Sequence, residues 1–325
     1  MIDNKYELGF FPTPLQELKK LSKTYSDYNL FIKRDDNTGL ASGGNKTRKL
    51  EYLIKQAIDA GCDTIITAGA QQSNHCRQTA AACAIAGLEC HLLLGGKEPK
   101  TYDGNLLLSS TLGATIHFTG DNRKGEDIQN VKKTLENQNK TCYVIPYGGS
   151  NLIGALGFVN AVKELKEQLI AQQLEIDYIF FASSSGGMQA GLTLGKELYQ
   201  LSATLVPISI DKDETNGLSL EEVVLNIVTE GTDVLNIKRE FELSDISLNR
   251  AYDKDGYGVV TENEINAINS LARNEGILLD PVYTGRAFYG MLDSLDREKI
   301  PLGSNVLFWH TGGLPAIFKY ADELR

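Results

Sequence analysis

Hydrophobic and polar positions follow two repeating patterns over most of this chain. Short apolar runs, such as 64–67 and 178–181, have the length and composition of buried strands. Between such runs the apolar residues recur at helical spacing, as over 50–58, where the pattern stops at Gly61. Strands that alternate with helices are typical of parallel sheets with crossover helices. The pattern therefore predicts an α/β fold.

The order of these elements predicts two lobes. Apolar runs predict strands at 64–67, 90–94, 114–118, 143–145, 178–181, 205–210 and 306–309. Helical spacing predicts a helix that begins near Lys46, helices at about 74–86, 105–112, 125–138 and 154–172, and further helical stretches to about 275. The strands up to residue 145 form one compact block, and a second lobe begins near Gly154. No repeat, low-complexity tract or Pro/Gly-rich linker separates them, so we expect the lobes to share an interface.

Composition narrows the class of protein. The chain has 325 residues, of which 42% are hydrophobic and 23% charged, as in ordinary globular proteins. Its formal net charge of -10 gives a mostly negative surface, so we expect no nucleic-acid partner. The segment 1–8 lacks the layout of a signal peptide, and no apolar run approaches about 18 residues. We therefore expect a soluble, cytoplasmic protein without a membrane segment.

The five cysteines point to free thiols rather than to a disulfide framework. Their number is odd and no C-x-x-C pair occurs, which suits a reducing compartment. Cys76 and Cys83 are seven residues apart, on one helix face, and His75 is close by. Because the ligand spacing of zinc sites is absent, we expect no metal site.

Four polar, glycine-rich segments occur where a strand ends or a helix begins. Open α/β sheets bind their ligands at such places, so the four segments could converge on one cleft between the lobes. They lie far apart in the sequence, at 43–46, 69–75, 183–191 and 310–313.

The first segment offers a reactive lysine. Gly43 and Gly44 let the backbone approach a bulky ligand, and Lys46 follows at a helix start. The positive end of the helix dipole helps keep the lysine amine uncharged and nucleophilic, as a Schiff-base lysine requires. Taken alone, Lys46 could also be a solvated lysine beside Arg48 and Lys49.

The second segment leads from a strand into a helix N-terminus. Free N–H groups there, together with the Ser73 hydroxyl and the Asn74 amide, suit a carboxylate and a phenolic oxygen. Simple N-capping by Ser73 or Asn74 is the alternative interpretation.

The other two segments suit a phosphate and an aromatic ring. The small polar turn at 183–187 could hold a phosphate by backbone amides and hydroxyls without a cation. Neither a dinucleotide nor a P-loop motif is present, because position 190 is Ala and no Ser or Thr follows Lys196. After the last strand, the Thr311 hydroxyl could meet a ring nitrogen. A flexible connector and a terminal turn are the respective alternatives.

Taken together, these segments resemble pyridoxal 5'-phosphate (PLP) enzymes of the tryptophan-synthase-β type, fold type II. Within that type they resemble the branch shared by D-cysteine desulfhydrase and 1-aminocyclopropane-1-carboxylate (ACC) deaminase. The matching motifs cover nearly the whole chain: Phe-Pro-Thr-Pro at 11–14, Ile-Lys-Arg-Asp-Asp at 32–36, Gly-Gly-Asn-Lys-x-Arg-Lys-Leu at 43–50, Gln-Ser-Asn-His at 72–75, Pro-Tyr-Gly-Gly-Ser-Asn at 146–151, Asp-Pro-Val-Tyr at 280–283 and His-Thr-Gly-Gly at 310–313.

The resemblance implies an architecture, a cofactor and a set of site residues. It implies two lobes of open, twisted, mostly parallel sheets with flanking helices: a large cofactor-binding domain from 1–49 and 161–325, and a small domain from 50–160. It also implies PLP as cofactor, a small amino-acid substrate and a homodimer. The implied roles are a Schiff base for Lys46, the cofactor 3'-oxygen for Asn74, the substrate carboxylate for Ser73 with the amides around Asn74 and His75, the phosphate for Ser183, Ser184, Ser185, Gly186 and Gly187, and the two active-site tyrosines for Tyr257 and Tyr283. The serine-rich phosphate loop departs from the more usual Gly/Thr-rich form.

Two positions separate the branches. ACC deaminases typically have Glu after the second tyrosine and Leu after the late histidine, whereas this chain has Thr284 and Thr311, as D-cysteine desulfhydrase does. A carboxylate near the ring nitrogen would make the ring the stronger electron sink that cyclopropane opening demands. A neutral hydroxyl suffices for β-elimination, because the leaving thiolate removes the electrons.

We therefore expect α,β-elimination of D-cysteine to pyruvate, ammonia and hydrogen sulfide, with Lys46 or Tyr283 as the base at Cα. ACC deaminase is the nearest alternative, followed by a lyase for another β-substituted amino acid such as a sulfonate. A non-catalytic amino-acid binding protein on the same scaffold is the alternative from a different class.

Overall fold

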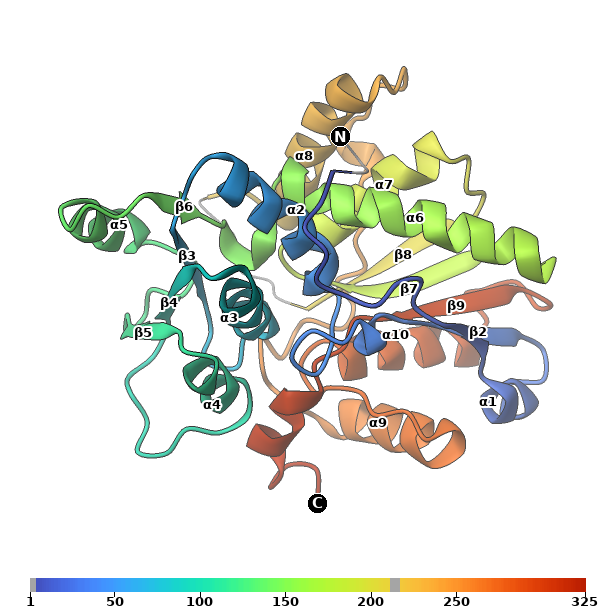
Figure 1. The fold of residues 1–325 in the computed structure, drawn as a ribbon. Coiled ribbons are helices and arrows are strands. Elements are labelled where there is room, and N and C mark those ends of the chain that lie inside the picture. Colours follow the sequence, from blue (N-terminus) through green and yellow to red (C-terminus); the bar gives the residue numbers. More distant parts are fainter. Residues whose placement is uncertain (1–3, 211–216) are drawn as a thin grey trace.

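The computed structural model describes residues 4–210 and 217–325, whose strands form two sheets (Figure 1). The larger sheet has the order β1-β2-β9-β7-β8 and the smaller one β5-β4-β3-β6. All neighbours are parallel except β1 and β2, which pair antiparallel. The strands are β1 (Leu15–Glu17), β2 (Asn29–Arg34), β3 (Thr64–Gly69), β4 (Glu89–Leu94), β5 (Thr115–Phe118), β6 (Cys142–Val144), β7 (Tyr178–Ser183), β8 (Thr204–Ser209) and β9 (Asn305–His310).

Helices flank both sheets. The α-helices are α1 (Lys19–Thr24), α2 (Lys46–Asp59), α3 (Asn74–Ala86), α4 (Gly104–Thr111), α5 (Ile128–Glu136), α6 (Leu152–Gln172), α7 (Gly187–Leu198), α8 (Leu220–Leu235), α9 (Glu262–Glu275) and α10 (Thr284–Asp296). Short 3-10 turns are η1 (Asp35–Asn37), η2 (Tyr147–Gly149), η3 (Leu243–Asp245) and η4 (Leu314–Tyr320). We call the larger sheet with its helices the large lobe, and the smaller sheet with α3, α4 and α5 the small lobe.

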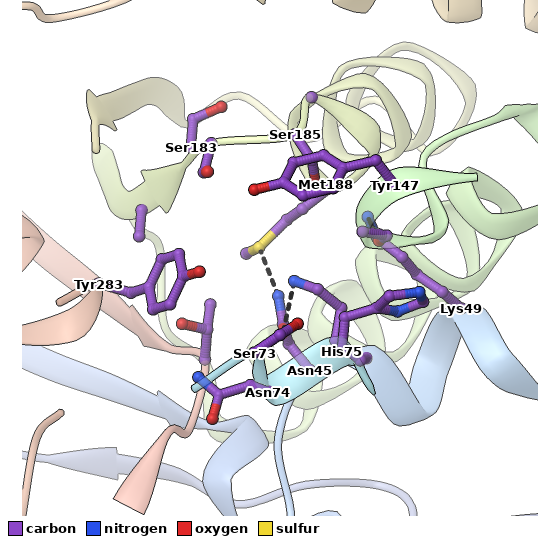
Figure 2. Close-up of a pocket in the computed structure, with 16 residues that line it drawn as sticks. Asn45, Lys49, Ser73, Asn74, His75, Tyr147, Ser183, Ser185, Met188 and Tyr283 are labelled. Carbon is purple, nitrogen blue, oxygen red and sulfur yellow. Dashed lines mark hydrogen bonds between the residues drawn. The ribbon is translucent and has the colours of Figure 1, made fainter. Parts of the chain in front are cut away.

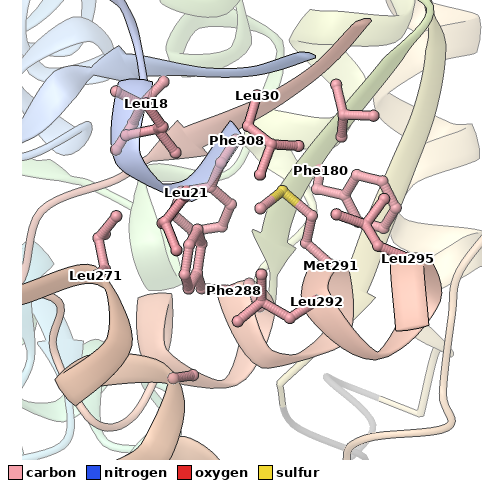
Figure 3. Packing of buried hydrophobic residues seen from close by; sticks show 14 of the residues in the cluster. Leu18, Leu21, Leu30, Phe180, Leu271, Phe288, Met291, Leu292, Leu295 and Phe308 are labelled. Carbon is pink, nitrogen blue, oxygen red and sulfur yellow. The ribbon is translucent and has the colours of Figure 1, made fainter. Parts of the chain in front are cut away.

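The larger sheet is buried on both faces. Along β7 successive side chains point to opposite sides, so Phe180 packs with Phe288 and Met291 of α10, as Figure 3 shows. Phe181 packs on the other side with Phe158 of α6. Burial on both faces explains why this strand is a continuous apolar run rather than an alternating one.

The smaller sheet has the same layered construction. Ile65 of β3 belongs to the core formed with α2 and α3, whereas its neighbour Ile66 packs with Ile128 and Leu135 of α5. The strands β7 and β3 therefore each separate two layers of helices, which is the arrangement of a doubly covered α/β fold.

The predicted α/β class with mostly parallel sheets is confirmed, and every strand expected from the apolar runs is present. The sequence reasoning missed β1, α1, β2 and α10. The expected domain limits at 49/50 and 160/161 fall inside α2 and α6, respectively, and the division stays a proposal. Among the described residues, no helix is long and apolar enough to cross a membrane.

Candidate active site

The N-terminal ends of α2, α3, α7 and α10 meet at one pocket with about 650 Å³ of empty space. Figure 2 shows Ser73 and Asn74 facing Ser183 and Ser185 across it, with Tyr283 on a third side. Helix N-termini present unsatisfied N–H groups and the positive end of the helix dipole. The pocket therefore suits a ligand with anionic groups.

Lys46 is the first residue of α2 and lines the pocket. Its Nζ donates a hydrogen bond to Asn45 Oδ1 at 3.3 Å. Burial lowers the pKa of Lys46 from 10.5 to about 8, against an opposing effect of Asp280. The alternative of a solvated lysine beside Arg48 and Lys49 is not supported, because Lys46 lines the pocket and both neighbours are buried, with Arg48 2% and Lys49 1% exposed.

Lys49 brings a buried cation to the pocket that the sequence reasoning did not assign. Its Nζ donates to Gly148 O at 3.0 Å and to Ser150 Oγ at 3.1 Å. Among the described residues no carboxylate bonds to it, and burial and the charge of Lys46 hold the pKa of Lys49 well below its usual range. A buried ammonium without a counter-charge favours an anion beside it.

The turn before α7 completes an anion cradle around Lys49. Ser150 Oγ accepts from Gly187 N at 3.1 Å and donates to Ser185 Oγ at 2.9 Å. The Ser183 hydroxyl instead donates to Gln189 Oε1 at 2.7 Å. A phosphate at this helix N-terminus would meet backbone amides, hydroxyls and the Lys49 amine, a group that the cation-free site expected from the sequence does not include.

Ser73 is the N-cap of α3, as the alternative interpretation has it. Its Oγ accepts from Cys76 N at 3.2 Å and keeps its own hydrogen to donate. Ser73 also lines the pocket, so capping does not remove it from the site.

A chain of hydrogen bonds fixes the orientation of the Asn74 amide. Arg77 Nη1 donates to Asn105 Oδ1 at 3.1 Å, which identifies the other end of the Asn105 amide as its nitrogen. Asn105 Nδ2 therefore donates to Asn74 Oδ1, at 2.8 Å. Because the Asn74 oxygen is occupied, its Nδ2 is the group left to donate. A donor at the start of α3 suits the 3'-oxygen of PLP.

Hydrogen-bond accounting also sets the tautomer of His75. Thr67 Oγ1 donates to Ile145 O at 2.9 Å and therefore accepts from His75 Nε2, at 2.9 Å. His75 Nδ1 is then a bare acceptor, buried and without a described partner. Burial and the charges of Lys46 and Lys49 hold the pKa of His75 well below its usual range, so the ring stays neutral.

The two tyrosines named by the resemblance form a pair. Their hydroxyls are 2.6 Å apart, and the rings meet edge to face with centroids 5.9 Å apart. Tyr283 lines the pocket and Tyr257 lies behind it. Burial raises the pKa of Tyr283 well above its usual range, and so does the proximity of Tyr257. Tyr283 therefore keeps its proton at neutral pH.

The two threonines that distinguish the branches have different surroundings. Thr284 is fully buried and donates from Oγ1 to Asp280 Oδ1 at 2.7 Å. The Asp280 carboxylate also accepts from the backbone amides of 282–284 and caps α10. Thr311 lines the pocket, and no described residue bonds to its hydroxyl. Of the two hydroxyls, that of Thr311 is the one free to meet a ring nitrogen.

A buried ionic network positions the first turn of α2. Arg48 bonds to Asp35 of η1 and, from Nη1, to Glu164 Oε2 of α6 at 2.9 Å. Lys33 of β2 bonds to the same Glu164. At Gly157 of α6 an added Cβ would overlap the backbone carbonyl of Arg48, so only glycine lets α6 approach α2 this closely. The position of Lys46 thus depends on elements from the N-terminal part and from the middle of the chain.

The structure brings most of the predicted site residues together. Those that line the pocket are Lys46, Ser73, Asn74, His75, Ser183, Ser184, Ser185, Gly186, Tyr283 and Thr311. Gly187, Tyr257 and Thr284 lie behind this lining. The residues that the sequence reasoning missed are Asn45, Lys49, Tyr147, Gly148, Ala182 and Met188. For Lys49 a signal existed, since it is three residues after Lys46 and hence on the same helix face.

The residues present fit PLP. The uncompensated Lys49 ammonium suits its phosphate, the Asn74 amide its 3'-oxygen, and Lys46 with its lowered pKa its aldehyde carbon. Fold and pocket thus define a PLP-dependent enzyme class. The family described as pyridoxal-phosphate dependent enzyme matches residues 6–312, and the chain belongs to this family. The predictions of fold type and cofactor are thereby confirmed.

Individual relatives place the similarity more narrowly. A D-cysteine desulfhydrase of Klebsiella pneumoniae is 39% identical over 330 residues, which cover 98% of this chain and 97% of that protein. A Pyrococcus abyssi protein, assigned provisionally by its name to ACC deaminase, is 39% identical over 317 residues, 96% of this chain and 92% of that protein. A crystal structure of an ACC deaminase homologue has a TM-score of 0.89 at 36% identity and covers 99% of this chain and 95% of its own. The predicted branch is thereby confirmed.

Proposed function

We propose that this chain catalyses the α,β-elimination of D-cysteine, in which D-cysteine and water give pyruvate, ammonia and hydrogen sulfide. One observation favours this reaction over cyclopropane opening: among the described residues, no aspartate or glutamate lines the pocket. The nearby Asp280 carboxylate is occupied by the start of α10. Only neutral hydroxyls are available to the ring nitrogen, which favours a reaction whose leaving group removes the electrons.

PLP supplies an electron sink for the bond that breaks at Cα. The residues of this chain supply position and proton transfer. The Ser73 hydroxyl and the amides at the start of α3 bind the substrate carboxylate and so fix which face of Cα meets the base.

Lys46 and Tyr283 differ in their suitability as that base. Burial lowers the pKa of Lys46 to about 8, so a substantial fraction of its amine is uncharged near neutral pH. Burial raises the pKa of Tyr283 well above its usual range, so this residue keeps its proton. We therefore assign the Cα base to Lys46, and to Tyr283 the donation of a hydrogen bond to the departing sulfur.

Three further features are proposed. The odd number of cysteines supports a cytoplasmic location. From the resemblance alone come a homodimer and a division into a large domain, 1–49 plus 161–325, and a small domain, 50–160. The similarity to named relatives supports the proposed reaction, since it covers nearly the whole length of both chains. The two names divide between the desulfhydrase and the deaminase, so substrate assays are needed.

Steady-state pyruvate formation from D-cysteine, L-cysteine and ACC tests the proposal. We expect turnover of D-cysteine well above that of the other two, and activity on ACC alone would overturn it. A cofactor absorbance band near about 420 nm, lost on borohydride reduction and in Lys46→Ala, distinguishes the enzyme from a binding protein. Purified protein that stays colourless after incubation with PLP contradicts the enzyme assignment.

A further inference from the structure

Arg123 reaches from the small lobe to the tyrosines of the site. It lies between β5 and α5, and its Cζ is 4.6 Å from the ring centroid of Tyr257, which belongs to the large lobe. Its Nη1 donates to the hydroxyl of Tyr147, a pocket residue, at 3.4 Å. A Cβ at Gly95 would be 2.6 Å from the Cβ of Arg123, so glycine is required there for Arg123 to occupy this place.

We propose that Arg123 is a positioning residue that orients Tyr257, and through it Tyr283, for the chemical step. Nothing in the sequence marks Arg123, because it lies in an ordinary polar segment, 121–127. The proposal rests on the proposed function only for the identity of the substrate. According to this proposal, a residue of the small lobe helps to orient two tyrosines of the large lobe.

A guanidinium over an aromatic face is attracted by the ring and fixes its orientation. Here the ring so held is that of Tyr257, whose hydroxyl is 2.6 Å from that of Tyr283. Two phenols this close share one hydrogen, so the second hydrogen must point elsewhere. The distance alone does not identify which of the two phenols is the donor. The more acidic phenol is the better donor.

The position of Arg123 favours Tyr257 as the donor. Its guanidinium Cζ is 4.6 Å from the ring centroid of Tyr257, and a cation over the ring makes the hydroxyl of that phenol the better donor. Burial raises the pKa of Tyr257, and its hydrogen bond with Tyr283 and the Arg123 charge oppose that rise. The hydrogen of Tyr283 is then free to point into the pocket toward the substrate side chain.

The second partner of Arg123 is Tyr147, and this contact lies where the two lobes meet. Tyr147 belongs to η2, which follows β6, while Tyr257 precedes α9. By contacting both, Arg123 connects a pocket residue that follows the small sheet with the large-lobe tyrosine that supports Tyr283. The tyrosine pair is therefore aligned only while the small lobe is in contact with the large one.

Three variants test the proposal on the cofactor-loaded enzyme. Arg123→Met keeps an unbranched, flexible side chain and removes its charge, Arg123→Lys keeps the charge, and Lys133→Met removes an exposed charge from the same lobe as a control. We expect Arg123→Met to lower kcat about 10-fold with KM changed less than about 3-fold. Arg123→Lys should recover most of the loss, and Lys133→Met should have no effect.

A double-mutant cycle with Tyr257→Phe separates positioning from general damage to the structure. If Arg123 acts through the Tyr257 hydroxyl, Arg123→Met should cost less than about 2-fold in the Tyr257→Phe background. An equal loss in both backgrounds overturns the proposal. So does a full loss in Arg123→Lys.

A measurement independent of turnover completes the test. D-alanine has no leaving group, and its dissociation constant can be obtained from the change in cofactor absorbance. We expect this constant to stay within about 2-fold in Arg123→Met, because the carboxylate site at Ser73 is untouched. A larger change contradicts the positioning role. If the wild type fails to turn over D-cysteine, the proposed function fails, while the same cycle on the substrate it does accept still tests Arg123.

Discussion

Both carboxylate oxygens of Asp35 accept hydrogen bonds from the Arg48 guanidinium, with Nε–Oδ2 and Nη2–Oδ1 distances of 2.8 Å. Arg48 is two residues after Lys46, so this pair attaches the first turn of α2 to the end of β2. Trp309 of β9 donates from Nε1 to the same carboxylate at 2.8 Å. The lysine that would hold the cofactor is thereby positioned by a fully buried ion pair.

Asp35→Asn should lower the free energy of unfolding by about 3–5 kcal/mol, because it leaves the buried Arg48 without its full counter-charge. Urea unfolding followed by the fluorescence of Trp309, the single tryptophan, measures the loss. The control is Glu221→Gln, which breaks the exposed pair with Arg250 and should cost about 1 kcal/mol or less. Equal effects of the two variants would show that burial of the pair is unimportant.

Glu164 should make the protein sensitive to acid. Burial alone would raise the pKa of Glu164, but Arg48 and Lys33 outweigh burial and lower it from 4.5 to about 2. A carboxylate with a lowered pKa stabilises the fold above pH 4.5 and loses that contribution as the pH falls toward about 2. The contribution is on the order of 3 kcal/mol.

The comparison of wild type with Glu164→Gln tests this pH dependence. Denaturant unfolding near neutral pH should show the variant less stable, and the difference should shrink as the pH falls below 4.5. A difference that stays constant down to about pH 3 would falsify the assignment of the acid sensitivity to Glu164.

Lys46 should set the pH dependence of cofactor capture. Only the uncharged amine attacks an aldehyde, so the rate at which cofactor-free protein takes up PLP should rise with pH and level off above about 8. Stopped-flow absorbance records this rate, and Lys46→Ala should show no capture. A rate that keeps rising toward pH 10.5 would indicate an amine with an ordinary pKa.

Lys49→Met should have opposite effects on the cofactor-free protein and on cofactor binding. The buried amine lacks a carboxylate partner among the described residues and stays desolvated in the cofactor-free protein, so its replacement by an apolar side chain should stabilise that protein by about 1 kcal/mol. The same change should weaken PLP binding about 10-fold or more, because the phosphate loses its cation. Thermal unfolding and equilibrium dialysis measure the two effects. A loss of stability together with unchanged PLP affinity would contradict the phosphate role.

Thr284 and Thr311 should separate stability from chemistry. Thr284→Val removes the hydroxyl that donates to the buried Asp280 and should cost about 1–3 kcal/mol in unfolding free energy. Thr311→Val should change stability by less than about 0.5 kcal/mol, since no described residue bonds to its hydroxyl, and should shift the cofactor absorbance. If Thr284→Val shifts the absorbance and Thr311→Val does not, the ring nitrogen meets Thr284 instead.

Sequence reasoning identified the buried strands because strands covered on both faces are continuous apolar runs, as β7 is. It missed β2 because Lys33 and Arg34 interrupt the apolar pattern. Lys33 is nevertheless fully buried, since Glu164 of α6 compensates its charge. A pattern of single residues does not contain such a partner, which lies 131 residues away.

In the candidate site, too, some residues could be predicted from the sequence and others could not. Segments with glycine and small polar residues at helix starts were identifiable, because those residue types have local physical reasons to be there. Tyr147 was not, since its contact with Arg123 is made only after folding. The spacing of Lys49 from Lys46 was a signal for its helix face, but its contacts with Gly148 and Ser150 are also made only after folding.

The chain passes between the two sheets through α2 and α6, which pack together where Gly157 meets the backbone of α2. Any rotation of one sheet against the other would turn about this crossing, as about a hinge. Lys46 is at the start of α2, close to that axis, whereas Ser73 lies between the end of β3 and the start of α3, in the small lobe. Such a motion would carry the carboxylate-binding end of α3 toward or away from a cofactor that barely moves. Admission of substrate would thus depend on the approach of the start of α3, while the attachment point of the cofactor at Lys46 stays near the axis.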